Sequence, residues 1–228
     1  MAALIWLLLL VPLLAGVLAG RRVRSVFARY RAVPNHAGLT GAELARAMLD
    51  AHGLSRIGLQ IAPGFLTDHY DPMAHVLRLS APVARERSVA ALGIAAHEAS
   101  HAYQDAEGSR AYRARRRVGE PVARLAPWLG FFFIGGFLFG VPAFIVLSLV
   151  YVAGLIAFAL ATVPVEVGAS KRAVAVLRRA GLADEQESDG IRRVLGAAAL
   201  TYVAGLLRQI GLFLALVAVA EATTRMVS

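Results

Sequence analysis

The residues His97-Glu98-Ala99-Ser100-His101 form the pattern in this chain with the clearest chemical meaning. Histidines at i and i+4 lie on one face of a helix, so both imidazoles can reach one ion. Zinc binds such nitrogens at about 2.0–2.1 Å and keeps a position for water in catalytic sites. Glu98 follows the first histidine directly, which predicts that its carboxylate acts on that water as a general base.

The residues before this motif argue against a solvated surface helix with two unrelated histidines. Residues 90–96 are all apolar or glycine, which is typical of a buried helix. A buried His-Glu-His cluster without a partner would cost free energy, and a bound metal ion removes that cost. We therefore predict that His97 and His101 bind Zn²⁺.

The third zinc ligand must come from elsewhere, and the residues leave five candidates open: Glu166, Glu107, Glu120, Asp105 and His69. Glu166 follows Pro164, which suits the first turn of a helix. Small residues after it would let this helix approach the motif helix closely. A carboxylate in a first helical turn also stabilises the helix dipole, so the local pattern alone does not decide its role.

Short elements are expected around the motif helix, which is predicted from residue 89 to about 105. Residues 40–43 form a capping box that starts a helix ending near residue 51. Alternating apolar residues predict strands over 57–61 and 75–79, and a turn-rich stretch at 68–72 lies between them.

The composition excludes an ordinary soluble globule. Of 228 residues, 58% are hydrophobic and 17% are charged, against about 45–50% and about 25% in soluble domains. Cysteine is absent, which excludes a disulfide scaffold. We attribute the net charge of +9 to Lys and Arg residues that set the orientation of a membrane protein, so nucleic-acid binding is not expected.

Apolar stretches predict about four transmembrane helices. Residues 2–20 precede an Arg cluster, an order that favours a membrane anchor over a secretory signal peptide. Residues 125–165 carry no charge, and Gly140-Val141-Pro142 divides them into a hairpin of about 126–141 and 143–163.

The fourth apolar stretch, residues 194–220, contains Arg208. It is either a span, which we favour, or an interfacial helix. Sixteen of the 24 Lys and Arg residues lie in 21–124 and six lie in 164–193. By the positive-inside rule, these two blocks are cytoplasmic and together form the catalytic domain.

Five blocks of sequence resemble the YugP-like family of neutral zinc metallopeptidases of bacterial membranes. They are Leu66-Thr-Asp-His-Tyr-Asp-Pro72, Leu79-Ser80, the motif region from Ala95 to Gln104, the region from Val163 to Ala173, and the region from Val194 to Ala204. The resemblance implies that His97 and His101 bind zinc, that Glu98 is the general base and that Glu166 is the third ligand.

This chain departs from the family pattern at two places. Ala99-Ser100 stands where the family usually has Val-Gly, and Val167-Gly168 follows Glu166 where the family has Phe-Asn or Phe-Asp. The second departure is expected to remove a side-chain contact to a ligand.

The arrangement is also similar to HtpX-type peptidases, which implies a small α+β zincin-like domain with a short β-hairpin before the HExxH helix. By that similarity, the strand at 75–79 is the sheet edge that pairs with an extended substrate backbone. His69 or Tyr70, in the turn before it, could stabilise the oxyanion. Asp68 and Asp71 lie in the same turn, where they either contribute to the active-site cleft or only stabilise the turn.

The sequence thus predicts a multi-pass zinc endopeptidase of the bacterial inner membrane with its catalytic side in the cytoplasm. Its expected partners are the lipid bilayer and a protein or peptide substrate, such as a membrane protein. Two alternatives are a non-enzymatic metal-binding membrane scaffold and an intramembrane protease of the site-2 type. The oligomeric state and the cleavage preference do not follow from the sequence.

Overall fold

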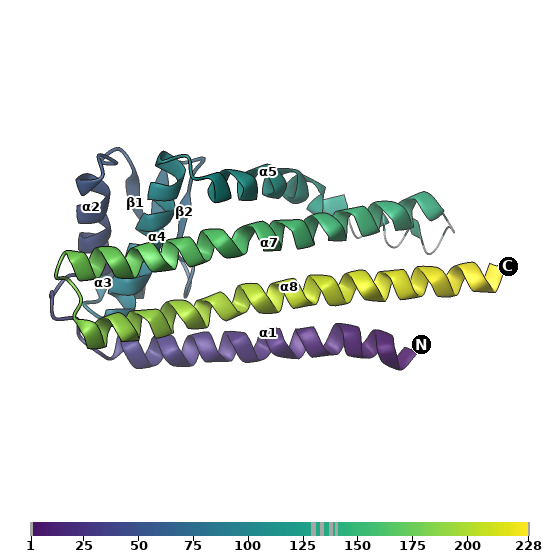
Figure 1. The fold of residues 1–228 in the computed structure, drawn as a ribbon, viewed down its shortest axis with the longest axis horizontal. Coiled ribbons are helices and arrows are strands. Elements are labelled where there is room, and N and C mark those ends of the chain that lie inside the picture. The colour runs from purple at the N-terminus through teal and green to yellow at the C-terminus, as the bar shows by residue number, and fades with distance from the viewer. Residues whose placement is uncertain (1, 129–130, 133–134, 137–138, 140, 228) are drawn as a thin grey trace. The chain divides into compact units, whose positions relative to one another are not determined.

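The computed structural model describes residues 2–128, 131–132, 135–136, 139 and 141–227. The protein is mainly helical with one small sheet (Figure 1). The chain forms two compact units. Unit 1 comprises Met1–Gly20, Arg113–Pro164 and Leu200–Ser228, and unit 2 comprises Arg21–Tyr112 and Val165–Ala199.

Three helices within the described residues are long and apolar enough to cross a membrane. They are α1 (Ala2–Arg31), α7 (Pro142–Arg179) and α8 (Glu185–Val227). The stretch predicted as a span over 194–220 is therefore part of one longer helix. The first arm of the predicted hairpin, 126–141, falls partly outside the described residues, so a total of four spans stays a prediction.

A helix was expected to begin after Pro164, and this expectation is wrong because α7 runs through the proline without a break. A proline removes one hydrogen bond within a helix, and long apolar helices tolerate that loss. The carbonyl left without its helical N–H donor is that of Leu160. The nearby Thr162 Oγ1 donates to a different carbonyl, that of Phe158, at 2.8 Å. Glu166 is thus far from any helix N-terminus, and the helix-dipole interpretation does not apply to it.

The helices of unit 2 enclose its core. The capping box predicted at Thr40 is confirmed and starts α2 (Gly41–Ala51). After α3 (Ala81–Arg85), the motif helix α4 extends over Val89–Ala106, close to the predicted bounds. Every residue from 89 to 104 is buried, so α4 forms the centre of the unit. Helix α5 (Arg110–Leu125) and a short 3-10 helix, Ala126–Trp128, follow it.

The sheet contains strands β1 (Gly58–Ala62), β2 (His69–Asp71) and β3 (Val76–Ser80), in the order β1-β3-β2. The two predicted strands are confirmed with a shift of one residue. The turn-rich stretch at 68–72 instead contains β2, which pairs antiparallel with β3 and forms the expected hairpin. Strand β3 also pairs in parallel with β1. It is the central strand, so the prediction that β3 is a free edge is wrong.

Candidate active site

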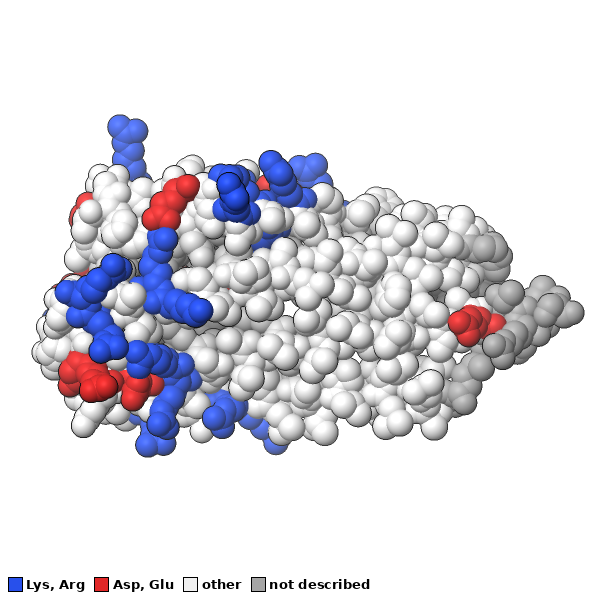
Figure 2. All heavy atoms as spheres, in the orientation of Figure 1, with Lys and Arg blue, Asp and Glu red and all other residues white. Residues whose placement is uncertain are grey.

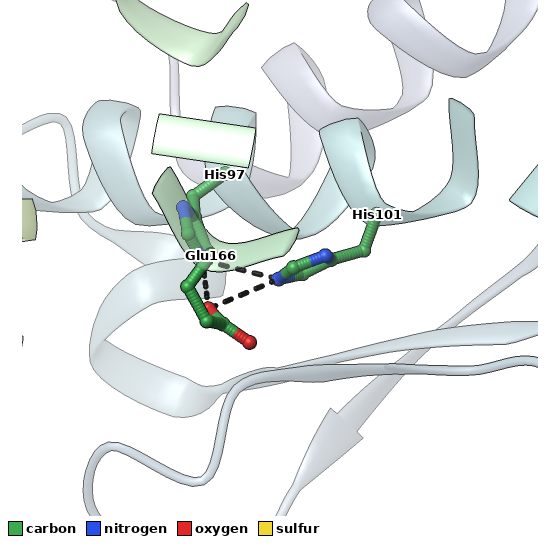
Figure 3. Close-up of side chains that lie close together, drawn as sticks. All are labelled: His97, His101 and Glu166. Atoms are coloured by element: carbon green, nitrogen blue, oxygen red, sulfur yellow. Dashed lines mark hydrogen bonds and ion pairs between the residues drawn. The ribbon is translucent and has the colours of Figure 1, made fainter. Parts of the chain in front are cut away.

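His97, His101 and Glu166 point toward one another at the interface of α4 and α7 in unit 2 (Figure 3). Glu166 Oε2 lies 3.1 Å from His97 Nε2 and 3.4 Å from His101 Nε2, and the two Nε2 atoms are 3.1 Å apart. All three side chains are buried. The structure therefore brings together the two predicted histidine ligands and one of the five candidates for the third. That they hold a metal ion stays a prediction.

Gln104 determines which nitrogen of His101 faces the cluster. Its Nε2 donates to the Val165 carbonyl at 2.9 Å, so its Oε1 faces His101 Nδ1, also at 2.9 Å. An amide oxygen only accepts hydrogen bonds, so in the neutral ring the proton is on Nδ1. The lone pair of Nε2 then points at the cluster, as metal binding requires.

His97 has an equivalent contact on its other nitrogen. Ser170 Oγ, one helical turn after Glu166 on α7, lies 3.2 Å from His97 Nδ1. Gln104 and Ser170 thus each join a histidine on α4 to helix α7, which carries the carboxylate. The sequence analysis missed both residues, although their spacing is a usable signal, because Gln104 is at i+3 from His101 and Ser170 is at i+4 from Glu166.

The electrostatics of the cluster favour a cation. Burial disfavours the charged imidazole, but the carboxylates of Glu166 and Glu98, with the Gln104 hydrogen bond, raise the pKa of His101 above its ordinary value. The same field attracts a metal ion in place of a proton.

The donor set also fits zinc in its spacing. Two imidazole nitrogens and a carboxylate oxygen are ligands that Zn²⁺ accepts, and three tetrahedral ligands at about 2.0–2.1 Å lie about 3.3 Å from one another. The distances of 3.1, 3.1 and 3.4 Å match that spacing closely.

Glu98 is buried on the same helix. Its carboxylate forms no hydrogen bond or ion pair with the residues that the structure describes. Asp68 lies close enough for the charge of Glu98 to act on it. Burial raises the pKa of Asp68, as does Glu98, while hydrogen bonds from Ser80 N and Oγ oppose the shift.

The other candidates for the third ligand have partners of their own. Glu107 accepts from Arg172 at 2.6 Å, and Glu120 lies 3.4 Å from Arg116. Asp105 accepts a hydrogen bond from the Tyr70 hydroxyl at 3.0 Å.

His69 and Tyr70, the predicted oxyanion residues, both lie on β2. His69 is exposed, and its Nδ1 lies 2.7 Å from the Thr67 carbonyl. Tyr70 is buried and its hydroxyl donates to Asp105. An oxyanion role for either residue stays a prediction.

The two departures from the family pattern have local explanations. Ser100 is fully buried and donates to the Ala96 carbonyl of its own helix at 2.7 Å. A Cβ on Gly168 would lie 3.1 Å from Gln104 Nε2. The absence of a side chain at Gly168 therefore leaves the space that the Gln104 amide occupies.

Comparison with known proteins identifies the family of the chain. The sequence profile of the family described as "Putative neutral zinc metallopeptidase" matches residues 5–221. The chain belongs to this zinc metallopeptidase family. It is 41% identical over 187 residues to the "Putative membrane protease YugP" of Bacillus subtilis (strain 168), which covers 82% of this chain and 83% of that relative. No solved structure matches this member of the family. The relatives favour neither the scaffold nor the site-2 alternative.

Proposed function

We propose that this protein is a membrane zinc endopeptidase in which His97, His101 and Glu166 hold Zn²⁺. The observation that carries the proposal is the convergence of three buried ligand atoms with a spacing that suits zinc. When bound, the zinc ion would lower the pKa of a water molecule and polarise the carbonyl of the scissile bond.

Glu98 is the general base in this proposal. Its buried carboxylate has no competing donor among the described residues, so it is available to take a proton from the attacking water. It then donates that proton to the nitrogen of the leaving amine. Gln104 and Ser170 hold the two imidazoles with their Nε2 atoms toward the site.

The outer edge of β2 is the proposed position of the substrate backbone. Within the described sheet, β2 pairs with β3 on one side only. Asp68 directly precedes β2 and senses the charge of Glu98, which supports a short distance from this edge to the base. An extended peptide can add to such an edge through backbone hydrogen bonds.

We also propose that the site faces the cytoplasm and acts on membrane proteins or membrane-proximal segments. The abundance of Arg in the two polar blocks supports this orientation. Glu166 lies on α7, which is itself a candidate membrane span.

Zinc content and peptidase activity of the purified full chain test the proposal together. We expect Glu98→Gln to retain zinc and to lose cleavage of casein or a membrane protein by about a hundredfold or more. Glu166→Ala should lose zinc as well. Glu107→Gln changes an exposed acidic residue directly after α4 and should retain both zinc and activity. A Glu98→Gln variant that cleaves at the normal rate would refute the mechanism.

A further inference from the structure

A groove between α7 and α8 in unit 2 lies beside the candidate active site and shares only Ser170 with it. Its volume is about 550 Å³, within the range of about 300–1,000 Å³ that is usual for ligand sites. Helix α7 contributes Val167, Lys171 and Arg178 to its lining, and α8 contributes Arg192, Gly196 and Ala199. Apolar atoms dominate this lining, and three of its side chains are cationic.

The groove has a basic end and an apolar end. Helices α7 and α8 are consecutive and antiparallel, and residues 180–184 join them (Figure 1). Arg178 and Arg192 are near this link, whereas Val167 and Ala199 are at the far end. Beyond that far end, Glu166 is the last charged residue of α7 back to its start, and α8 carries none until Arg208.

The cations of the groove are available to an anion. Lys171 and Arg178 form no ion pair with any residue in the part of the chain that the structure describes, and Arg192 pairs only with the exposed Asp189. Figure 2 shows Lys and Arg side chains gathered over the ends of α7 and α8 that adjoin their link. The three cations of the groove make its basic end complementary to a phosphate.

We propose that this groove binds an anionic phospholipid. Arg178, Arg192 and Lys171 bind the headgroup phosphate, since cations beside membrane helices attract anionic lipids. One acyl chain lies along the apolar end, toward Val167 and Ala199, where its burial is favourable. A soluble phosphate compound would use the basic end and gain nothing from the apolar end.

The Ser170 side chain lies between the proposed lipid and the candidate metal site. Ser170 lines the groove, and its Oγ also lies 3.2 Å from His97 Nδ1. The binding proposal itself does not depend on peptidase activity, and its test measures the lipid directly.

The test uses the zinc-loaded full chain in nanodiscs that contain equal amounts of phosphatidylglycerol and phosphatidylcholine. Native mass spectrometry measures the lipid retained on each protein. Arg178→Gln/Arg192→Gln removes two groove cations. The matched control Arg179→Gln/Arg193→Gln removes two exposed cations from neighbouring positions that do not line the groove.

A third variant, Gly196→Leu, fills the groove without changing its charge. A Cβ at Gly196 has open space around it, so this substitution should not disturb the helix packing. Thermal unfolding of each variant checks that the fold is retained.

We expect the wild-type chain to retain phosphatidylglycerol in preference to phosphatidylcholine. Arg178→Gln/Arg192→Gln and Gly196→Leu should each weaken this retention at least about tenfold, and the control should not. Equal losses in the groove variant and the control would show general surface attraction and overturn the proposal. It would also be overturned if inorganic phosphate displaced the lipid fully and Gly196→Leu had no effect, because the site would then bind a free anion.

Discussion

At the scale of single residues, the candidate site depends on the residues that hydrogen-bond to the candidate ligands as much as on those ligands themselves. His101 can offer Nε2 to a metal ion because Gln104 accepts from Nδ1 and is itself fixed by the Val165 carbonyl. Gly168 leaves room for that amide. Gln104 on α4 can therefore supply the contact that the family's Asn or Asp at position 168 is expected to make, and no further residue of α7 is needed.

Removal of the Gln104 amide should weaken zinc binding without unfolding the protein. In Gln104→Leu, the His101 ring loses the partner that fixes its tautomer, so we expect zinc affinity to fall about 10–100-fold. Competition with a chromophoric chelator measures this change. Ser100→Ala is the matched control, because Ser100 is equally buried on α4 but bonds only to its own helix. Equal losses in both variants would indicate a general packing defect of α4.

The sequence predicted the two candidate ligands on α4 but could not select the third one. His97 and His101 are local to one helix, so their spacing alone places them on a common face. Glu166 is 69 residues from His97, and no periodic pattern connects the two. The resemblance to a family supplied Glu166, and tertiary packing of α7 on α4 brings it to the histidines.

At the scale of elements, errors of prediction occurred where stability comes from pairing and not from local pattern. The capping box at Thr40 and the apolar run of α4 define their helices locally, and both were predicted correctly. Strand β2 has three residues, and it exists because it pairs with β3. Its turn residues predicted only the reversal of the chain. Pro164 signalled a helix start, but the packing of long helix α7 overrides that signal.

A pH-dependent contact joins the segment after α1 to the start of α8. His36 pairs through Nδ1 with Glu187, and its Nε2 lies 3.1 Å from the Gly181 carbonyl. These hydrogen bonds, with Glu187 first and Gly181 second, raise the pKa of His36 above its ordinary 6.5. The stabilisation is therefore fully present below about pH 6.5 and is lost as the pH rises through the pKa of the folded state.

We expect thermal unfolding of the wild type to shift to lower temperature as the pH increases from about 6 to about 8. His36→Gln should remove that part of the pH dependence, and the difference between the two proteins isolates it from other titrating groups. Identical pH profiles for the two proteins would show that the pair contributes nothing.

Helix α1 and helix α8 approach each other closely at Gly211 within unit 1. A Cβ at Gly211 would lie 2.1 Å from the Leu8 carbonyl oxygen and 3.1 Å from Pro12 Cγ. Small residues allow such backbone contact between apolar helices. Gly211→Leu should therefore destabilise the protein by about 1–3 kcal/mol, measured as thermal unfolding in detergent. Gly205→Leu, on the same helix with open space at its Cβ, should change stability little. A large loss in both variants would contradict this reasoning.

At the scale of the whole molecule, the two chain segments that make up unit 2 constrain how the chain crosses the membrane. Residues 21–112 and 165–199 pack into one compact unit, so both lie on the same side. If α7 is a span that ends at that side, its start at Pro142 lies on the opposite side. A further crossing between residues 112 and 142 would then be needed, and this fourth span stays a prediction from the sequence.

Single-cysteine labelling can test this topology without a background, since the natural chain has no cysteine. We would introduce Ser55→Cys in unit 2, Phe139→Cys before α7 and Glu221→Cys near the end of α8, all at exposed positions. With a membrane-impermeant maleimide, Ser55→Cys should react only in inside-out vesicles. Phe139→Cys and Glu221→Cys should react only in right-side-out vesicles, because α7 and α8 each carry the chain across. If Phe139→Cys reacted from the same side as Ser55→Cys, the segment before α7 would not cross and α7 could not be a span. If all three reacted from the sides opposite to these, the crossings would stand but the active site would face away from the cytoplasm.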